Sequence, residues 1–113
     1  MTLTTAQALK LWHDVNLDLV LDDAPDLSAR QTTILLTIYL EPPPHTVRGL
    51  AAKLNVTKPV ITRALDSMGQ MGLVARRRDA QDRRNVLIQR TVEGSLFLEH
   101  LADTIARNAS GSL

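Results

Sequence analysis

The sequence has no cysteine, few aromatic residues and no long apolar run, and each absence excludes a class of protein. Without cysteine there is no disulfide frame, thiol nucleophile, thiolate metal site or cysteine redox switch. Three aromatic residues, Trp12, Tyr39 and Phe97, are too few for a platform that stacks the bases of single-stranded nucleic acid. No run is long enough to span a bilayer and no signal segment opens the chain. We therefore expect a cytoplasmic protein without a membrane partner.

Residue patterns typical of enzymes are also missing. His13, His45 and His100 lie in separate predicted elements and lack the spacing of metal ligands. The sequence contains no glycine-rich phosphate loop and no nucleophile motif. The acidic pair Asp22-Asp23 fits the polar end of a helix better than an acid–base dyad. We expect no catalytic activity, no metal site and no cofactor.

Charge is unevenly distributed along a chain whose net charge is only +1. From His45 to Arg90 there are ten basic and three acidic residues, a net charge of +7. The rest of the chain has three basic and nine acidic residues, a net charge of −6. A basic centre between acidic flanks indicates one surface that binds a polyanion.

The length of the chain fits a single domain over residues 1–113. Its first part predicts two helices. The first helix covers about residues 4–21 and ends before Pro25. Ser28 and Gln31 form a capping-box pattern for the second helix. Leu36 and Leu40 broaden its apolar surface, so we expect this helix to be buried on most sides. Three prolines, at positions 42–44, must end this helix and stiffen the connection. A proline-rich recognition motif is the alternative explanation of that run.

Residues Thr46 to Met68 predict two helices joined by a tight turn at positions 55–57. Thr46 is a candidate N-cap for the first helix and Thr57 for the second, with Pro59 in the first turn. The second helix has an apolar side and an opposite side with Lys58, Thr62 and Arg63. Such a helix, presented by a partner helix, has the properties needed to enter a DNA major groove. The alternative is two ordinary packed helices with a solvated basic face.

A charged hairpin and a last helix complete the predicted order. Gly69 or Gly72 ends the preceding helix, and Gly72 suits the left-handed position after it. Strands are expected from Leu73 and over residues 85–89. The loop over residues 77–84 is polar and charged. Thr91 is a candidate N-cap for a final helix over residues 92–108, and we expect a frayed tail over residues 110–113. Gly49, inside a predicted helix, suggests a close approach of two helices.

The terminal helices, 4–21 and 92–108, have apolar surfaces too wide for one small core to cover. We therefore expect them to form a two-fold dimer interface. Its predicted residues are Leu9, Trp12, Leu98, Leu101 and Ile105.

From residue 27 to residue 94 the chain resembles the MarR family of bacterial transcription regulators. The matching segments are LSARQTTILLTIYL and TVRGLAAKLNVTKPVITRALDSMGQMGLVARRRDAQDRRNVLIQRTVEG. The most specific part is GLVARRRDAQDRR followed by a strand and Thr91-x-x-Gly94. The chain ends sooner after this motif than is usual in the family.

This resemblance implies a mainly α fold with a small β-hairpin wing, a winged helix-turn-helix in the order α-α-α-α-β-β-α. It also implies a homodimer that binds double-stranded DNA at a pseudo-palindromic operator, most commonly as a repressor. Helix 57–68 would read the major groove and wing 76–85 the minor groove or the backbone, with Asp82 holding the wing tip. Small phenolic effectors are usual ligands in the family, but the short C-terminus would reduce or remove their cleft. The DNA-binding residues expected are Thr46, Thr57, Lys58, Pro59, Thr62, Arg63, Arg78, Arg83 and Arg84.

Two alternatives stay open. Side chains alternate along a strand, so Arg76, Arg77 and Arg78 cannot all face DNA, and at least one is expected in solvent or paired with Asp79. The fold could also serve as a protein–protein interaction adaptor without its own operator. The number of arginines in the wing argues against the adaptor.

Overall fold

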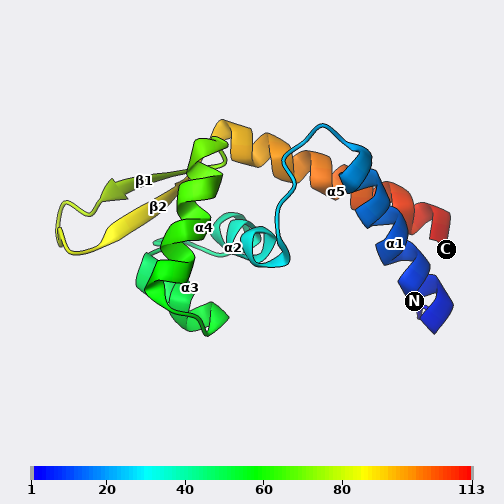
Figure 1. Cartoon of the computed structure of the whole chain (residues 1–113), viewed down its shortest axis with the longest axis horizontal. Helices are drawn as coiled ribbons and strands as arrows, with labels where there is room; N and C mark the ends of the chain where they lie inside the picture. The colour runs from blue at the N-terminus through cyan, green and yellow to red at the C-terminus, as the bar shows by residue number, and fades with distance from the viewer. Residues whose placement is uncertain (1, 113) are drawn as a thin grey trace. The chain divides into compact units, whose positions relative to one another are not determined.

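The computed structural model describes residues 2–112, which form five helices and one two-stranded antiparallel sheet (Figure 1). The predicted winged helix-turn-helix order is confirmed. No helix in this range is both long and apolar enough to cross a membrane. The elements are α1 (Thr5–Leu21), α2 (Ala29–Leu40), α3 (Val47–Leu54), α4 (Lys58–Gln70), β1 (Val74–Arg78), β2 (Val86–Arg90) and α5 (Val92–Ser112).

Backbone contacts divide the chain into two compact units. The winged unit is Leu27–Leu96, and the terminal unit combines residues up to Asp26 with residues from Phe97 onward. The winged unit therefore contains α2, α3, α4 and the hairpin, together with the first turn of α5. The terminal unit contains α1 and the rest of α5.

Short-range capping contacts fix where most of the helices begin. Ser28 accepts a hydrogen bond from the Gln31 N–H while the Gln31 side chain accepts one from the Ser28 N–H, which confirms the capping box. Thr46 and Thr91 cap α3 and α5 by accepting from the N–H groups of Gly49 and Gly94. Thr57 occupies the N-cap position of α4, but its side chain makes no capping hydrogen bond, so that part of the prediction is wrong.

Two left-handed residues end α3 and α4. Asn55 has φ 56° and ψ 48°, while the N–H groups of Asn55 and Val56 donate to Ala52 and Ala51. Gly72 has φ 80°, and Gly72 and Leu73 donate to the carbonyls of Gly69 and Met68. This second pattern is a Schellman motif, which glycine permits because it has no Cβ. It turns the chain from α4 directly into β1.

The core of the winged unit lies where α2, α3, α4 and the hairpin meet. Its buried side chains come from α2, α4 and both strands, and Leu50 adds the contribution of α3. Leu40 is 76% exposed, so α2 is less widely buried than its apolar surface predicts. The larger core side chains are Ile34, Leu35, Ile38, Leu50, Ile61, Leu65, Met68, Leu73, Val74 and Ile88, and Ala51 and Ala64 are buried with them.

The hairpin pairs Val74 with Arg90, Arg76 with Ile88 and Arg78 with Val86. Because side chains alternate along a strand, these six lie on one face, and buried Val74 and Ile88 show that this face packs on the helices. The Ile88 N–H also donates to the His45 carbonyl, beside an isolated bridge between Thr46 and Leu87. The strands lie one residue later in the chain than the sequence predicts.

The terminal unit buries Val15 of α1 and Leu101 and Thr104 of α5. Asn108 donates to Asp18 at 2.8 Å, and His100 is paired with Asp22. Two expectations are corrected here. The helix continues through Ser112, where a frayed tail was expected over residues 110–113; residue 113 lies outside the described residues. Leu101 is only 9% exposed, so it packs inside the unit.

Gly49 does not mark a close approach of two helices. A Cβ built there would have only the Thr46 hydroxyl oxygen nearby, at 3.2 Å. The expected helix contact is therefore wrong. The capping bond to Thr46 accounts for the crowding at this position.

Candidate nucleic-acid interface

One side of α4 presents polar and cationic side chains that the fold does not use. Lys58, Pro59 and Arg63 are exposed and Thr62 is half-buried, while Ile61 and Leu65 on the other side are buried. Within the described residues, no hydrogen bond or ion pair involves the side chains of Lys58, Thr62 or Arg63. This side can offer hydrogen bonds and positive charge to a ligand without losing an internal contact.

The predicted contacts at the start of the two helices are less free. The Thr46 hydroxyl oxygen accepts a hydrogen bond from the Gly49 N–H at 3.0 Å, so Thr46 already serves as the N-cap of α3. Thr57 is exposed, and its side chain is not used as a cap. Thr57 and Lys58 therefore stand together at the exposed N-terminus of α4, where backbone N–H groups favour an anion.

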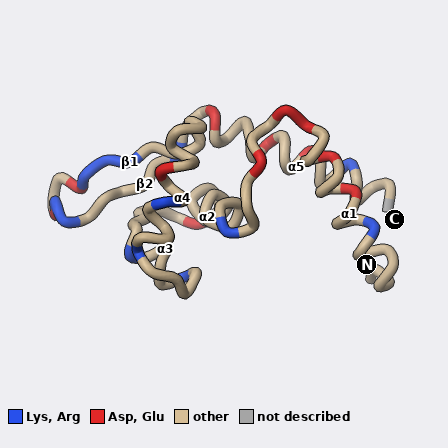
Figure 2. The backbone as a smooth tube through the Cα atoms, in the orientation of Figure 1, with Lys and Arg blue, Asp and Glu red and all other residues tan. Residues whose placement is uncertain are grey.

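The arginines of β1 have different surroundings, as the alternation of side chains requires. Arg76, on the helix-facing side, donates from Nη2 to Asp66 Oδ1 of α4 at 2.7 Å. Arg78, on the same side, donates from Nη1 to the Arg83 carbonyl at 2.7 Å and so braces the wing loop. Arg77, on the opposite side, is exposed. Figure 2 shows Lys and Arg along β1 and around the wing loop.

Arg78 supports the wing through one guanidinium nitrogen and keeps an exposed side chain, so its contact with DNA stays a prediction. The carbonyl that it binds belongs to Arg83, which keeps its own side chain exposed. Asp79, expected as a possible arginine partner, accepts from the Gln81 N–H at 2.9 Å and shapes the loop. Part of the charge in the wing sequence therefore also serves to shape the wing loop.

Asp82 organises the wing tip. Its Oδ1 accepts from the backbone N–H and from Nε of Arg84, both at 3.1 Å. The Arg84 side chain is nevertheless 91% exposed, so it is held in direction and remains accessible. The hydrogen bond from the Arg84 side chain lowers the pKa of Asp82, and the Arg84 N–H and the charge of Arg48 act in the same direction. Asp82 thus stays ionised at moderately acidic pH.

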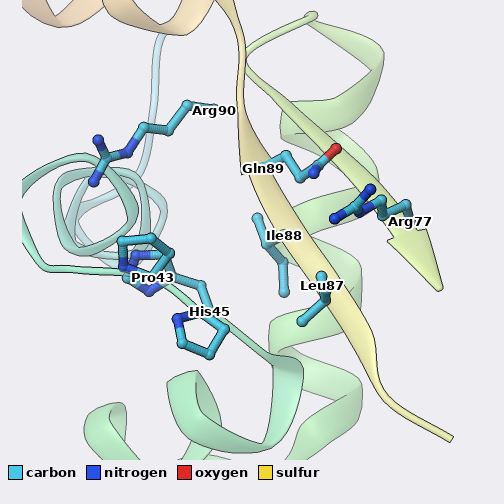
Figure 3. A pocket seen from close by; sticks show the side chains of 8 residues that line it. Pro43, His45, Arg77, Leu87, Ile88, Gln89 and Arg90 are labelled. Carbon is cyan, nitrogen blue, oxygen red and sulfur yellow. The ribbon is translucent and has the colours of Figure 1, made fainter. Parts of the chain in front are cut away.

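A cavity of about 520 Å³ lies beside β2, next to the proline run (Figure 3). Arg77 and Arg90 both line it, but they extend on opposite sides of β2 in Figure 3. The guanidinium of Arg90 donates to the carbonyls of Ile38 and Glu41 at 2.9 and 3.1 Å, at the end of α2. It also lies 5.8 Å from the ring centre of Tyr39. These two cations therefore do not converge on one ligand in the cavity.

The structure brings most of the predicted interface together in the winged unit. Lys58, Pro59, Thr62 and Arg63 share α4, and Arg83 and Arg84 share the wing tip. Whether these residues contact DNA stays a prediction.

Reasoning from the sequence missed Asp66, which accepts from Arg76 of β1. Its spacing from Thr62 and Arg63 places it on the same side of α4, and that spacing was the available signal. Within residues 2–112, no group of three or more metal-ligating side chains is present.

Comparison with known proteins agrees with this geometry. The model of the MarR family matches residues 27–86, more than half of the chain. The HTH-type transcriptional repressor YetL of Bacillus subtilis is 44% identical over 50 residues, which are 44% of this chain and 30% of that protein. The chain thus matches less than a third of the length of this curated relative.

Solved structures show the same fold. The YusO protein of Bacillus subtilis has a TM-score of 0.80 at 19% identity, covering 96% of this chain and 74% of its own. A mutant of MarR from E. coli, complexed with operator DNA, has a TM-score of 0.69 at 23% identity. This match covers 91% of the present chain and 68% of the MarR chain. Together with the family match, the fold leads to one conclusion: this chain belongs to the MarR family of transcription regulators and has the winged helix-turn-helix fold.

Proposed function

We propose that the protein is a dimeric, sequence-specific repressor that binds a pseudo-palindromic operator in double-stranded DNA. Helix α4 reads base edges in the major groove, and the wing over residues 76–85 reaches the minor groove or the phosphate backbone. The name of the similar YetL protein, a transcriptional repressor, supports the repressor role. The structure of E. coli MarR with operator DNA, which shares this fold, supports duplex DNA as the ligand.

The observation that carries this proposal is the state of the basic side chains on α4 and at the wing tip. Lys58 and Arg63 are exposed, and neither is paired within the described residues. Arg83 is exposed, and Arg84 is aimed by Asp82 while remaining accessible. A DNA duplex has phosphates along both grooves, and these can pair with the exposed basic groups of α4 and the wing tip. Thr62 and Arg63 can form hydrogen bonds with base edges.

A second copy of the chain is the proposed partner of the exposed apolar side chains in α1. Leu9 and Trp12 are 67% and 63% exposed, and both are large. A monomer seldom exposes a contiguous apolar patch of this kind. A two-fold dimer would cover them and would place two α4 helices on half-sites roughly one turn of DNA apart.

Selection of bound duplexes from a random pool tests binding, symmetry and spacing together. We expect enriched sequences with an inverted repeat whose half-sites are separated by about ten base pairs. We also expect gel-shift affinity for the enriched duplex to fall steeply as salt increases. Failure to retain any duplex at low salt would contradict the proposal and favour the protein-interaction adaptor.

A further inference from the structure

A carboxylate lies on the side of α4 that is proposed to face DNA. Asp66 is four residues after Thr62 and three after Arg63, so all three share one side of the helix. Its side chain is 54% exposed. An unpaired carboxylate at this position would repel DNA phosphates. Asp66 is therefore expected to have a basic partner within the fold.

Asp66 is neutralised by the wing. Arg76 Nη2 lies 2.7 Å from Asp66 Oδ1, and the arginine side chain is 34% exposed. Among the hydrogen bonds of residues 2–111, this is the only one that joins a side chain of β1 to α4. It therefore ties the third turn of α4 to the middle of β1.

The hairpin has its buried side chains toward its inner end, so a tie at Arg76 would restrict the outer half. Val74 and Ile88 are buried, while Arg77, Arg78 and the loop residues Arg83 and Arg84 are exposed. A two-stranded hairpin has little stability of its own, so its outer half can bend. Arg76 is paired with Ile88 in the register, at the boundary between the packed and the exposed half.

We propose that Asp66 and Arg76 form a positioning pair that sets the distance and angle between α4 and the wing tip. With the pair formed, α4 and the wing arginines can contact one duplex at the same time. This inference rests on the proposed function, because it assigns these two residues to DNA binding without contact to DNA. Two other roles compete: Asp66 could accept from a cytosine amino group, or Arg76 could bind a phosphate.

The experiment measures affinity of D66N, R76Q and the double variant D66N/R76Q for the duplex selected from the random pool. A positioning pair predicts that each single variant weakens binding by roughly three- to tenfold and that the double variant is no weaker than the worse single one. D66N is the sharpest case, since removal of a negative charge near phosphates would by itself tighten binding. The matched control is D26N, which makes the same change of charge at an exposed aspartate outside α4 and the wing.

The same substitutions in an R83A/R84A background separate the three roles. If the pair acts by placing the wing, D66N has no further effect once the wing-tip arginines are gone. If Asp66 reads a base, its effect persists in that background and depends on the base. If Arg76 binds a phosphate, R76Q reduces the salt dependence and D66N tightens binding.

Distance measurement provides a readout that does not depend on DNA. The chain has no cysteine, so A80C in the wing loop and Q70C at the end of α4 give two unique nitroxide labels. Labelled protein diluted with unlabelled copies should give a narrow distance distribution that D66N broadens. An ion pair this exposed contributes little to folding stability, so the variants should remain folded by circular dichroism.

A parent protein that binds no duplex would refute the proposed function. A parent that binds while D66N binds equally well or more tightly would overturn the positioning role alone, as would an unchanged distance distribution.

Discussion

Tyr39 connects four parts of the winged unit through one hydroxyl group. Its oxygen accepts from the Thr91 N–H at 2.8 Å, and it lies 2.9 and 3.2 Å from the carbonyls of Leu73 and Thr91. The Thr91 hydroxyl in turn donates to the Gly72 carbonyl at 2.7 Å and accepts from Gly94. These contacts join α2, the turn after α4, the end of β2 and the start of α5.

Replacement of Gly94 by alanine should destabilise the fold. A Cβ at this position would collide with the Tyr39 hydroxyl and the Leu73 carbonyl, which are themselves hydrogen-bonded. Overpacking of this kind costs about 1–3 kcal/mol, so the midpoint of urea unfolding should decrease.

Gly111→Ala is the matched control for this prediction, because it makes the same change in the same helix with no atom within 4 Å. The control should be neutral or should gain up to about 1 kcal/mol, from helix propensity. Equal midpoints for Gly94→Ala and Gly111→Ala would show that the Tyr39 contacts do not restrict this position.

At the scale of the element, the wing depends on carboxylates as well as on arginines. Asp79 and Asp82 fix the loop by accepting from the N–H groups of Gln81 and Arg84. Arg78 closes the base of the loop against the Arg83 carbonyl. The hairpin therefore uses part of its charge to shape itself and presents the remainder at its tip.

Single replacement of Arg83 or Arg84 by alanine should weaken binding to most duplexes. Each arginine that contacts one phosphate contributes about one unit to the slope of log affinity against log salt, so the slope should decrease by about 1. Fluorescence anisotropy titrations between low and moderate salt measure this slope. Arg30→Ala removes an exposed charge from the first turn of α2, outside the predicted interface, and should leave the slope unchanged.

Replacement of Thr62 or Arg63 in α4 should also relax the sequence preference, by about 1–3 kcal/mol for a good base contact. The ratio of affinities for the selected duplex and a random duplex measures this preference. Wing variants should keep that ratio. If α4 and wing variants changed it equally, the division between reading bases and holding phosphates would be wrong.

At the scale of the whole molecule, the two units combine different kinds of surface. The winged unit contains the predicted DNA contacts, and the terminal unit exposes apolar side chains of α1 while it carries many of the acidic residues of the chain. Some of these acidic groups are paired within the unit, among them Asp14 with Lys10 and His13, and Asp18 with Arg107 and Asn108. Repulsion by a polyanion would keep such a surface away from DNA.

Trp12→Glu or Leu9→Glu should convert the proposed dimer into a monomer, because a carboxylate would be buried in the apolar interface. Light scattering at micromolar concentration measures the mass, and circular dichroism confirms that the helices persist. Lys10→Gln, which changes the charge of an exposed side chain in the same helix, should keep the parental mass. A monomeric parent would contradict the dimer.

Stability should depend on acidic pH through Asp22. The hydrogen bond with the His100 side chain lowers the pKa of Asp22 below its ordinary value of 3.8. Between the lowered pKa and 3.8 the unfolded chain binds more protons, so stability increases with pH in that range and is lost as pH decreases through it. Thermal unfolding of Asp22→Asn should show a flatter pH profile below pH 4, whereas Asp23→Asn, which lacks this partner, should retain the parental profile.

The sequence by itself determined the order of the elements, most of their ends and the family. Ser28, Thr46 and Thr91 each cap a helix by contacting a residue three positions away, and Gly72 needs only its own backbone freedom. Interactions over such short separations are encoded in a local pattern, so they could be predicted. The basic centre of the chain was visible for the same reason.

Only the tertiary structure decided which arginines have partners within the fold. Arg76, Arg78 and Arg90 look like the other arginines in sequence, but their partners lie on α4, across the wing loop and at the end of α2, up to 52 residues away. The burial of Leu101 and the exposure of Leu40 were decided in the same way. A side chain's partner depends on which elements pack against it, and helical periodicity or net charge along the chain does not contain that information.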